Sequence, residues 1–190
     1  MEATKRLVIG ITGASGAPLA LELLRQLQDC PQVEAHVILS HCGELTLSHE
    51  ENMDREDLKA LCHTLYDNQD YGAGPASGSF QTMGMVIIPC SMKTLAGVVI
   101  GYCDTLLLRA ADVTLKERRP LVLVPRECPL STLHLRNLTT ASELGAMIVP
   151  PVPAYYNHPK TIEDVNRQVA AKVLSRFQLG AVPEWRGMTP

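Results

Sequence analysis

Five short apolar runs rich in β-branched residues constrain the fold of this chain most strongly. They lie at residues 7–11, 35–39, 85–88, 121–124 and 146–149, and stretches with helical periodicity lie at 17–27, 55–65, 95–100, 105–116, 132–144 and 162–177. Runs that alternate in this way are typical of right-handed βαβ crossovers and a parallel sheet. We therefore predict a doubly wound α/β fold of the flavodoxin-like or Rossmann-like kind, formed as a single domain by residues 1–190.

The charge of the chain argues against two classes of partner. Its 190 residues carry a net charge of −3, and both signs are spread along the sequence. Nucleic acid and membrane surfaces are therefore not expected as partners. The uncharged stretch 7–21 follows Lys5 and Arg6 as in a signal peptide, but glycines and a proline interrupt it and Glu22 ends it. We expect a cytoplasmic protein.

The cysteines and histidines predict no metal site. The six cysteines include no C-x-x-C pair, and the six histidines form no H-x-H or H-E-x-x-H pattern. Free thiols in a reducing compartment are favoured over a disulfide framework or a zinc site.

A glycine-rich turn, TGASG at residues 12–16, follows the first apolar run. Such a turn lets backbone N–H groups approach an anion, and the helix that follows places its positive end there. The spacing departs from the dinucleotide fingerprint G-x-G-x-x-G, and the hydroxyls of Thr12 and Ser15 suit a single phosphate or a reacting group. The alternative is a simple reversal of the chain.

Polar residues follow the later apolar runs, where a doubly wound sheet binds its ligands. In PCSMKT (89–94), Ser91 and Thr94 can hold a phosphate or the polar edge of a ring, or Ser91 can simply cap a helix. Arg126 and Glu127 follow the run at 121–124 between two prolines, so a guanidinium that grips an anion stands beside a carboxylate that can move a proton.

Three further segments have both a functional and a structural interpretation. Arg109, Asp112 and Lys116 share one helix face, as a ligand site or as a solvated ladder of ion pairs. The glycine-rich stretch 67–79 is expected to be a binding loop or an oligomer contact. Two adjacent tyrosines in the proline-rich stretch 150–159 favour a binding wall, and Trp185 favours the cap of a pocket or an interface.

Taken together, six segments of the chain resemble the flavin prenyltransferases of the UbiX and Pad1 type. These segments are TGASGA (12–17), PASGS (75–79), PCS (89–91), RAADV (109–113), LKE (115–117) and VLVPRE (122–127). The resemblance implies a flavodoxin-like homododecamer with flavin between subunits and no metal. It implies that reduced FMN is joined to dimethylallyl phosphate to give prenyl-FMN. A separate UbiD-type decarboxylase would receive that product as its cofactor.

The same resemblance implies roles for individual residues, and the sequence departs from the family at one of them. Lys172 stands where the family commonly has arginine, and Arg176, one turn later, is the alternative phosphate ligand. Tyr71 matches an aromatic residue of the family's pocket. The implied catalytic residues are Glu127, Ser15 and Lys116; the FMN-binding residues are Gly13, Ala14, Ser15, Ser40, Ser91, Met92, Lys93, Thr94 and Arg126; and the substrate-binding residues are Tyr156, Lys172, Arg109, Glu50 and Trp185.

Two rival functions share the flavin. One is a flavin-dependent cysteine decarboxylase, whose family carries PASANT where this chain has PASGSF at residues 75–80. The other is a flavin-binding partner of a decarboxylase with no chemistry of its own, which would not require Glu127 and Lys116.

Overall fold

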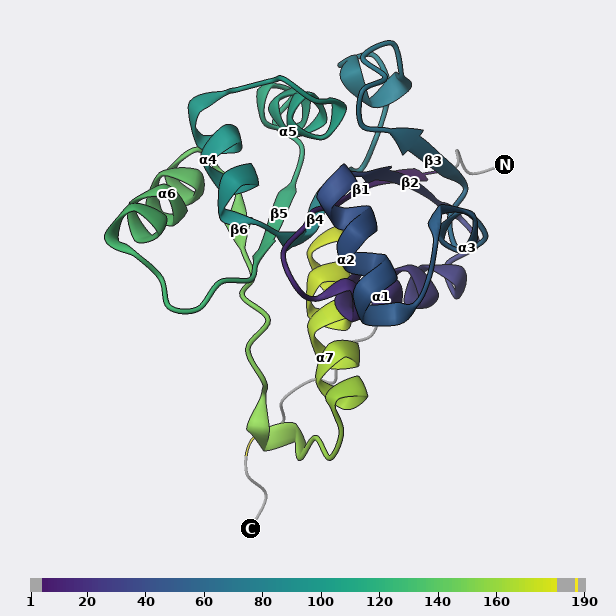
Figure 1. Ribbon diagram of the computed structural model, residues 1–190, viewed down its shortest axis with the longest axis vertical. Helices are drawn as coiled ribbons and strands as arrows, with labels where there is room; N and C mark the ends of the chain where they lie inside the picture. The colour runs from purple at the N-terminus through teal and green to yellow at the C-terminus, as the bar shows by residue number, and fades with distance from the viewer. Residues whose placement is uncertain (1–4, 181–186, 188–190) are drawn as a thin grey trace.

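The protein folds around one six-stranded parallel sheet with strand order β3-β2-β1-β4-β5-β6 (Figure 1). The computed structural model describes residues 5–180 and residue 187. The strands are β1 (Lys5–Ile11), β2 (Val33–Leu39), β3 (Thr64–Asp67), β4 (Gly84–Cys90), β5 (Leu121–Pro125) and β6 (Met147–Ile148). The order reverses between β1 and β4, so the carboxyl ends of these two strands mark the topological switch point.

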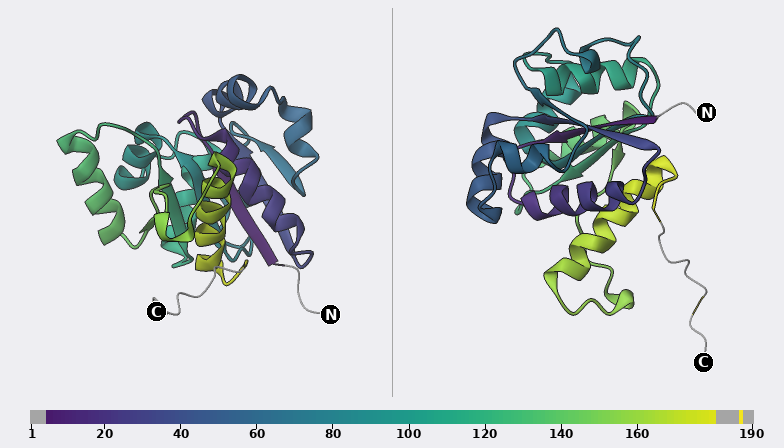
Figure 2. Two further views of the ribbon diagram at one scale, coloured as in Figure 1. Left: turned by 90° about the horizontal axis from the view of Figure 1, so that it is seen from below. Right: turned by 90° about the vertical axis from the view of Figure 1, so that its right-hand side faces the viewer.

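Helices cover both faces of the sheet (Figure 2). One core contains side chains of α1 (Ala17–Gln28) and α7 (Ile162–Leu174), together with Leu47 of α2 (His41–Glu51) and Leu58 of α3 (Arg55–Lys59). The opposite core contains side chains of α4 (Met92–Ile100), α5 (Leu106–Lys116) and α6 (Thr132–Glu143). Short 3-10 turns complete the fold: η1 (Gly74–Ala76), η2 (Tyr155–Asn157) and η3 (Ser175–Phe177).

The strands β4 and β5 are apolar along their whole length, and β1 is apolar from Leu7 onward, because both faces of the sheet are buried there. Along β1, Leu7, Ile9 and Ile11 point into the core beside α1, and Val8 points into the core beside α5. This alternation follows from the two-residue period of a strand. It confirms the prediction of buried parallel strands within a doubly wound sheet.

Three elements, α2, α3 and β3, differ from the sequence-based prediction. The predicted helix 55–65 is wrong beyond residue 59, because α3 ends at Lys59 and β3 begins at Thr64. The helix α2 was not predicted at all. With the five predicted strands alone the order would be 2-1-3-4-5, as in flavodoxin, and β3 extends it to the 3-2-1-4-5-6 order of the Rossmann sheet.

After β6 the chain leaves the sheet as an arm, residues 149–161, with η2 in its outer part, and then returns as α7 (Figure 1). Its side chains include exposed apolar groups: Val152 is 68% exposed and Tyr155 is 77% exposed. Within the described residues, no helix combines the length and the apolar character that crossing a bilayer requires.

Candidate functional site

A cavity of about 580 Å³ lies at the carboxyl ends of β1, β2, β3 and β4. The start of α5 closes one side of it through Thr105, Leu107 and Leu108. The remaining lining residues lie at or just after the strand ends, except Arg55 in α3 and Asp104 before α5: Thr12, Gly13, Leu39, Ser40, His41, Cys42, Glu44, Arg55, Asp67, Asn68, Gln69, Ser91, Lys93, Thr94 and Asp104. The cavity is therefore where a doubly wound sheet is expected to bind its ligand.

The turn after β1 packs tightly against the start of α2. A Cβ atom on Gly13 would lie 2.3 Å from the Cβ of Cys42, and one on Gly43 would lie 2.7 Å from the carbonyl oxygen of Ile11. Only glycine permits this approach at either position. The backbone N–H of Ser40 also donates to the Ile11 carbonyl at 3.0 Å, which fixes the end of β2 beside β1.

Two helix N-termini line the cavity with hydroxyl groups. The Ser40 hydroxyl caps α2 by accepting from the N–H of Gly43 at 3.0 Å. The Ser91 hydroxyl caps α4 by accepting from the N–H of Thr94 at 3.3 Å, and it lies 3.0 Å from the Thr94 hydroxyl. Hydroxyls and positive helix ends favour an anion such as a phosphate. The N-cap interpretation of Ser91 and the ligand interpretation are thus compatible.

The hydroxyl of Thr12 is committed to the protein itself. Thr12 is 2% exposed, and its hydroxyl donates to the carbonyl of Pro89 at 2.6 Å and accepts from the N–H of Ser91 at 2.9 Å. The sequence suggested that this hydroxyl meets a phosphate or a reacting group. In the structure it instead joins the ends of β1 and β4.

The positive end of α1 is occupied by a carboxylate of the same chain. Glu50 accepts from the N–H groups of Gly16 and Ala17 at 2.9 and 2.8 Å. Burial alone would raise the pKa of Glu50, but hydrogen bonds from the Ser15 hydroxyl and from these two N–H groups outweigh burial and lower the pKa. These N–H groups, predicted to cradle a phosphate, therefore already hold an anion.

Arg126 and Ser15 join Glu50 beside this helix end. The Nε of Arg126 donates to the carbonyl of Ser15 at 3.0 Å, and the positive charge of Arg126 also favours the Glu50 carboxylate. Glu127 is exposed next to Arg126, and its carboxylate accepts from the N–H of Cys128 at 3.0 Å. A shallow hollow of about 420 Å³ adjoins the group; it is lined by Ser15, Gly16, Pro18, Leu19, His49, Glu50, Ile162 and Asn166.

Lys116 lies at the opposite end of β5 from Arg126 and Glu127. It precedes the strand and they follow it, and a strand of this length separates its two ends by roughly 15 Å. Lys116 pairs with Glu117 there. The structure of one chain therefore does not bring Lys116 and Glu127 together.

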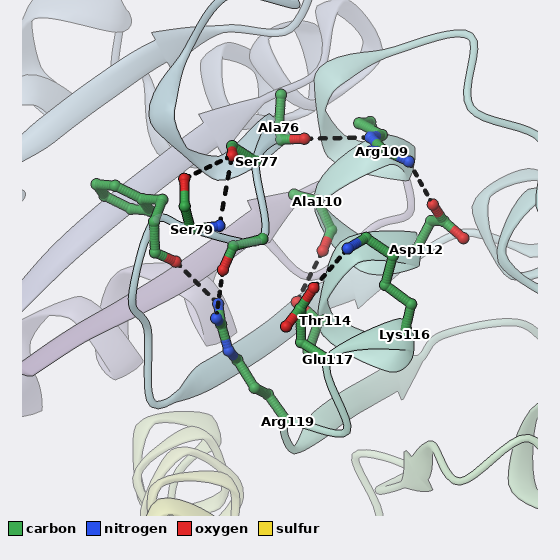
Figure 3. A network of polar contacts seen from close by, with 12 residues as sticks. Ala76, Ser77, Ser79, Arg109, Ala110, Asp112, Thr114, Lys116, Glu117 and Arg119 are labelled. Carbon is green, nitrogen blue, oxygen red and sulfur yellow. Dashed lines mark hydrogen bonds and ion pairs between the residues drawn. The ribbon is translucent and has the colours of Figure 1, made fainter.

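Arg109 belongs to the same region as Lys116 (Figure 3). Its Nε donates to the carbonyl of Ala76 at 3.1 Å, and its Nη1 contacts Asp112 at 2.7 Å. The expected ion-pair ladder is thus present between Arg109 and Asp112, while Lys116 takes Glu117 as its partner. Close by, Arg119 donates to the carbonyls of Gly78 and Phe80 at 2.7 and 2.8 Å, so two arginines fix the backbone of the loop 74–80.

Most of the remaining predicted site residues do not line the cavity. Tyr156 is 61% exposed in η2, and Lys172 and Arg176 are exposed at the end of α7 and in η3. Tyr71 does not line the cavity, but its hydroxyl donates to the carbonyl of Asp104, which does. Of the predicted flavin contacts, Lys93 lines the cavity, whereas Ala14 is buried and Met92 packs against the core beside α5. Trp185 lies outside the described residues.

The sequence analysis missed several residues of the cavity wall, among them Arg55 and Asn68. Arg55 donates from Nη2 to the carbonyl of Tyr66 at 3.1 Å, and Asn68 accepts from the N–H of Leu107 through its side chain at 3.0 Å. Both face the cavity because β3 is a strand of the sheet. No local sequence signal marks either residue.

Comparison with known proteins gives concordant results. The family model described as Flavoprotein matches residues 1–174. The chain is 49% identical to the flavin prenyltransferase UbiX of Escherichia coli (strain K12), over 96% of this chain and 99% of that protein. It is 50% identical to the flavin prenyltransferase LpdB of Lactiplantibacillus plantarum, over 92% of this chain and 94% of that protein.

Solved structures give the same picture. A dodecameric FMN-dependent UbiX-like decarboxylase from Escherichia coli O157:H7 superposes with a TM-score of 0.93 at 48% identity, over 96% of this chain and all of that chain. AnUbiX (PadA1) in complex with FMN and dimethylallyl pyrophosphate also superposes with a TM-score of 0.93, at 42% identity, over 97% of this chain and 99% of that chain. The FMN-dependent cysteine decarboxylase SpaF is only 20% identical, with a TM-score of 0.64 over 89% of this chain and 99% of that chain, so this likeness shows the fold alone.

Proposed function

The chain belongs to the flavoprotein family and, within it, to the UbiX-type flavin prenyltransferases, and from that premise we propose that it joins the dimethylallyl group of dimethylallyl phosphate to N5 and C6 of reduced FMN. The product would be prenyl-FMN, supplied to a UbiD-type decarboxylase in the cytoplasm. The reaction would need no metal.

The cavity at the switch point is the observation that carries this proposal. Its volume of about 580 Å³ lies within the range of roughly 300–1,000 Å³ typical of small-molecule sites. The hydroxyls of Ser40, Ser91 and Thr94, with Lys93 nearby, suit the phosphate of FMN. Gly13 lies on the same wall, where the absence of a side chain lets the turn after β1 pack against Cys42 at the start of α2.

The residues near the cavity fit the charges that develop in the reaction. Breaking an allylic C–O bond releases a phosphate and leaves positive character on the allyl carbon, so both charges need stabilisation. Ring closure at C6 of the flavin displaces a proton. We assign Glu127 to accept that proton, with Ser15 assisting and Arg126 orienting Ser15 through its carbonyl.

Three groups of proposed substrate residues lie apart within one chain. Glu127 follows β5, Lys116 and Arg109 lie near the 74–80 loop, and Tyr156 is carried by the arm. We propose that neighbouring copies bring the three surfaces together around one substrate and so exclude water, which would trap an allyl cation. The dodecameric state of the Escherichia coli O157:H7 relative supports an assembly of this kind.

The decisive experiment is anaerobic incubation of the protein with reduced FMN and dimethylallyl monophosphate, followed by mass measurement of the flavin. A flavin heavier by one isoprenyl unit is the expected result. Unmodified flavin, with dimethylallyl diphosphate also tried, would favour the non-catalytic partner. Release of CO2 from a cysteinyl substrate would favour the cysteine decarboxylase.

A further inference from the structure

We infer that Thr12 is a positioning residue for the flavin phosphate, acting through the backbone of Ser91. This inference rests on the proposed function of the cavity as the FMN site. Thr12 follows β1 and Ser91 follows β4, the two strands at the topological switch point. The Thr12 hydroxyl is the side-chain group that joins these two segments through hydrogen bonds in both directions.

The geometry of the Thr12 hydroxyl leaves it little freedom to contact a ligand. It donates its proton to the carbonyl of Pro89 at 2.6 Å, and it accepts the N–H of Ser91 at 2.9 Å. Thr12 is 2% exposed, so both bonds lie out of water. A buried hydroxyl with a donor and an acceptor in place acts on its surroundings by holding them.

The group that Thr12 holds is the N-cap of α4. The Ser91 hydroxyl accepts from the N–H of Thr94 at 3.3 Å and lies 3.0 Å from the Thr94 hydroxyl, and both hydroxyls face the cavity. A fixed Ser91 backbone therefore fixes both hydroxyls and the positive end of α4. Gly13 follows Thr12 directly. The two hydrogen bonds of the Thr12 hydroxyl therefore set the distance between the glycine turn and the proposed phosphate-binding hydroxyls of Ser91 and Thr94.

Substitutions of Thr12 distinguish its positioning of Ser91 from an effect on the stability of the whole fold. Thr12→Val keeps the shape of the side chain but leaves the Pro89 carbonyl and the Ser91 N–H without their partner. Thr12→Ser keeps the hydroxyl. Thr114→Val is the matched control, because Thr114 is also buried, at 3% exposure, and donates a single 2.7 Å bond to the carbonyl of Ala110 away from the cavity. Figure 3 shows the Thr114 bond within α5.

The test is titration of each variant with FMN, followed by flavin fluorescence, with thermal unfolding used to establish that the variant is folded. We expect Thr12→Val to weaken FMN binding about tenfold, and Thr12→Ser and Thr114→Val to stay within about twofold of the wild-type protein. In turnover assays, the KM for reduced FMN should rise in Thr12→Val while the KM for dimethylallyl phosphate stays the same.

Several results would overturn the inference. These are wild-type FMN affinity in folded Thr12→Val, an equal loss in Thr114→Val, or no recovery in Thr12→Ser. If Thr12→Val does not fold, Thr12→Cys replaces it, since a thiol is a weak donor and acceptor. The titration needs no prenyl transfer, so wild-type protein that binds FMN without modifying it would contradict the proposed function and leave this test intact.

Discussion

The carboxylate of Glu50, near the end of α2, accepts a hydrogen bond from the backbone N–H of Ala17 at the start of α1, with 2.8 Å between the two atoms. A second bond comes from the N–H of Gly16. The negative charge of Glu50 thus compensates the positive end of α1. We expect Glu50→Gln to lower the free energy of unfolding by about 1 kcal/mol at neutral pH.

The pH dependence of this effect follows from the lowered pKa of Glu50. A carboxylate whose pKa is lower in the folded state stabilises the protein fully above its ordinary pKa, about 4.3 for glutamate. That contribution is lost as the pH falls through the folded value. Urea unfolding from pH 7 to pH 3 should therefore show the difference between wild type and Glu50→Gln shrinking below about pH 4, and Glu51→Gln is the control. A constant difference would contradict this account.

Arg55 should distinguish FMN from riboflavin. Arg55 lines the cavity, and its guanidinium has five N–H donors, of which one binds the Tyr66 carbonyl. Loss of a charged hydrogen bond to the phosphate should weaken FMN binding about tenfold or more in Arg55→Ala. Riboflavin lacks the phosphate, so its affinity should not change. Titration of both flavins checks this, with the exposed Arg167→Ala as control; equal losses for both would place Arg55 away from the phosphate.

Activity should be recovered by mixing two inactive variants. Lys116 and Glu127 lie at opposite ends of β5 in one chain, and we propose that different copies supply them to one site. Lys116→Ala and Glu127→Gln should each lower kcat by about 100-fold or more. Co-expression with two affinity tags, followed by purification on both, gives mixed assemblies in which some sites carry both native residues. Mixed assemblies as inactive as their parents would show that the two residues do not serve one site.

Cys42 should report on occupation of the cavity. It is exposed on the cavity wall, whereas burial raises the pKa of the Cys90 thiol to about 12 and keeps it unreactive. N-ethylmaleimide should modify Cys42 and leave Cys90 intact, and FMN should slow the modification of Cys42. Cys128 is exposed away from the cavity and serves as the internal control. Peptide mass spectrometry measures each site; equal protection of Cys42 and Cys128 would contradict the placement of FMN.

The sequence predicted the strands better than the edge of the sheet. Buried strands such as β4 and β5 are continuous apolar runs, which periodicity detects. The edge strand β3 is four residues long and none of its residues is fully buried, so its sequence carries no comparable pattern. The helix α2 contains Gly43 and buries only two residues, which weakens the helical signal.

The site residues that local sequence could predict differ in the same way from those that it could not. Ser91 and Thr94 were predictable because they directly follow a strand whose end is fixed by the sheet. Arg55 was not, because its place on the cavity wall depends on how β3 pairs with β2. The bonds from Gly16 and Ala17 to Glu50 join residues more than thirty positions apart, and no local pattern encodes them.

Arg109 and Arg119 hold the 74–80 loop through its main-chain carbonyls. The loop is also braced from within, because the Ser77 hydroxyl lies 2.9 Å from the Ser79 hydroxyl and accepts from the N–H of Ser79 at 3.4 Å. A Cβ on Gly78 would lie 2.2 Å from a carboxylate oxygen of Glu117, so a side chain there would push the Glu117 carboxylate away from its ion pair with Lys116. A substitution at Gly78 would therefore disturb the Lys116–Glu117 pair first, while the two arginines keep their hold on the loop.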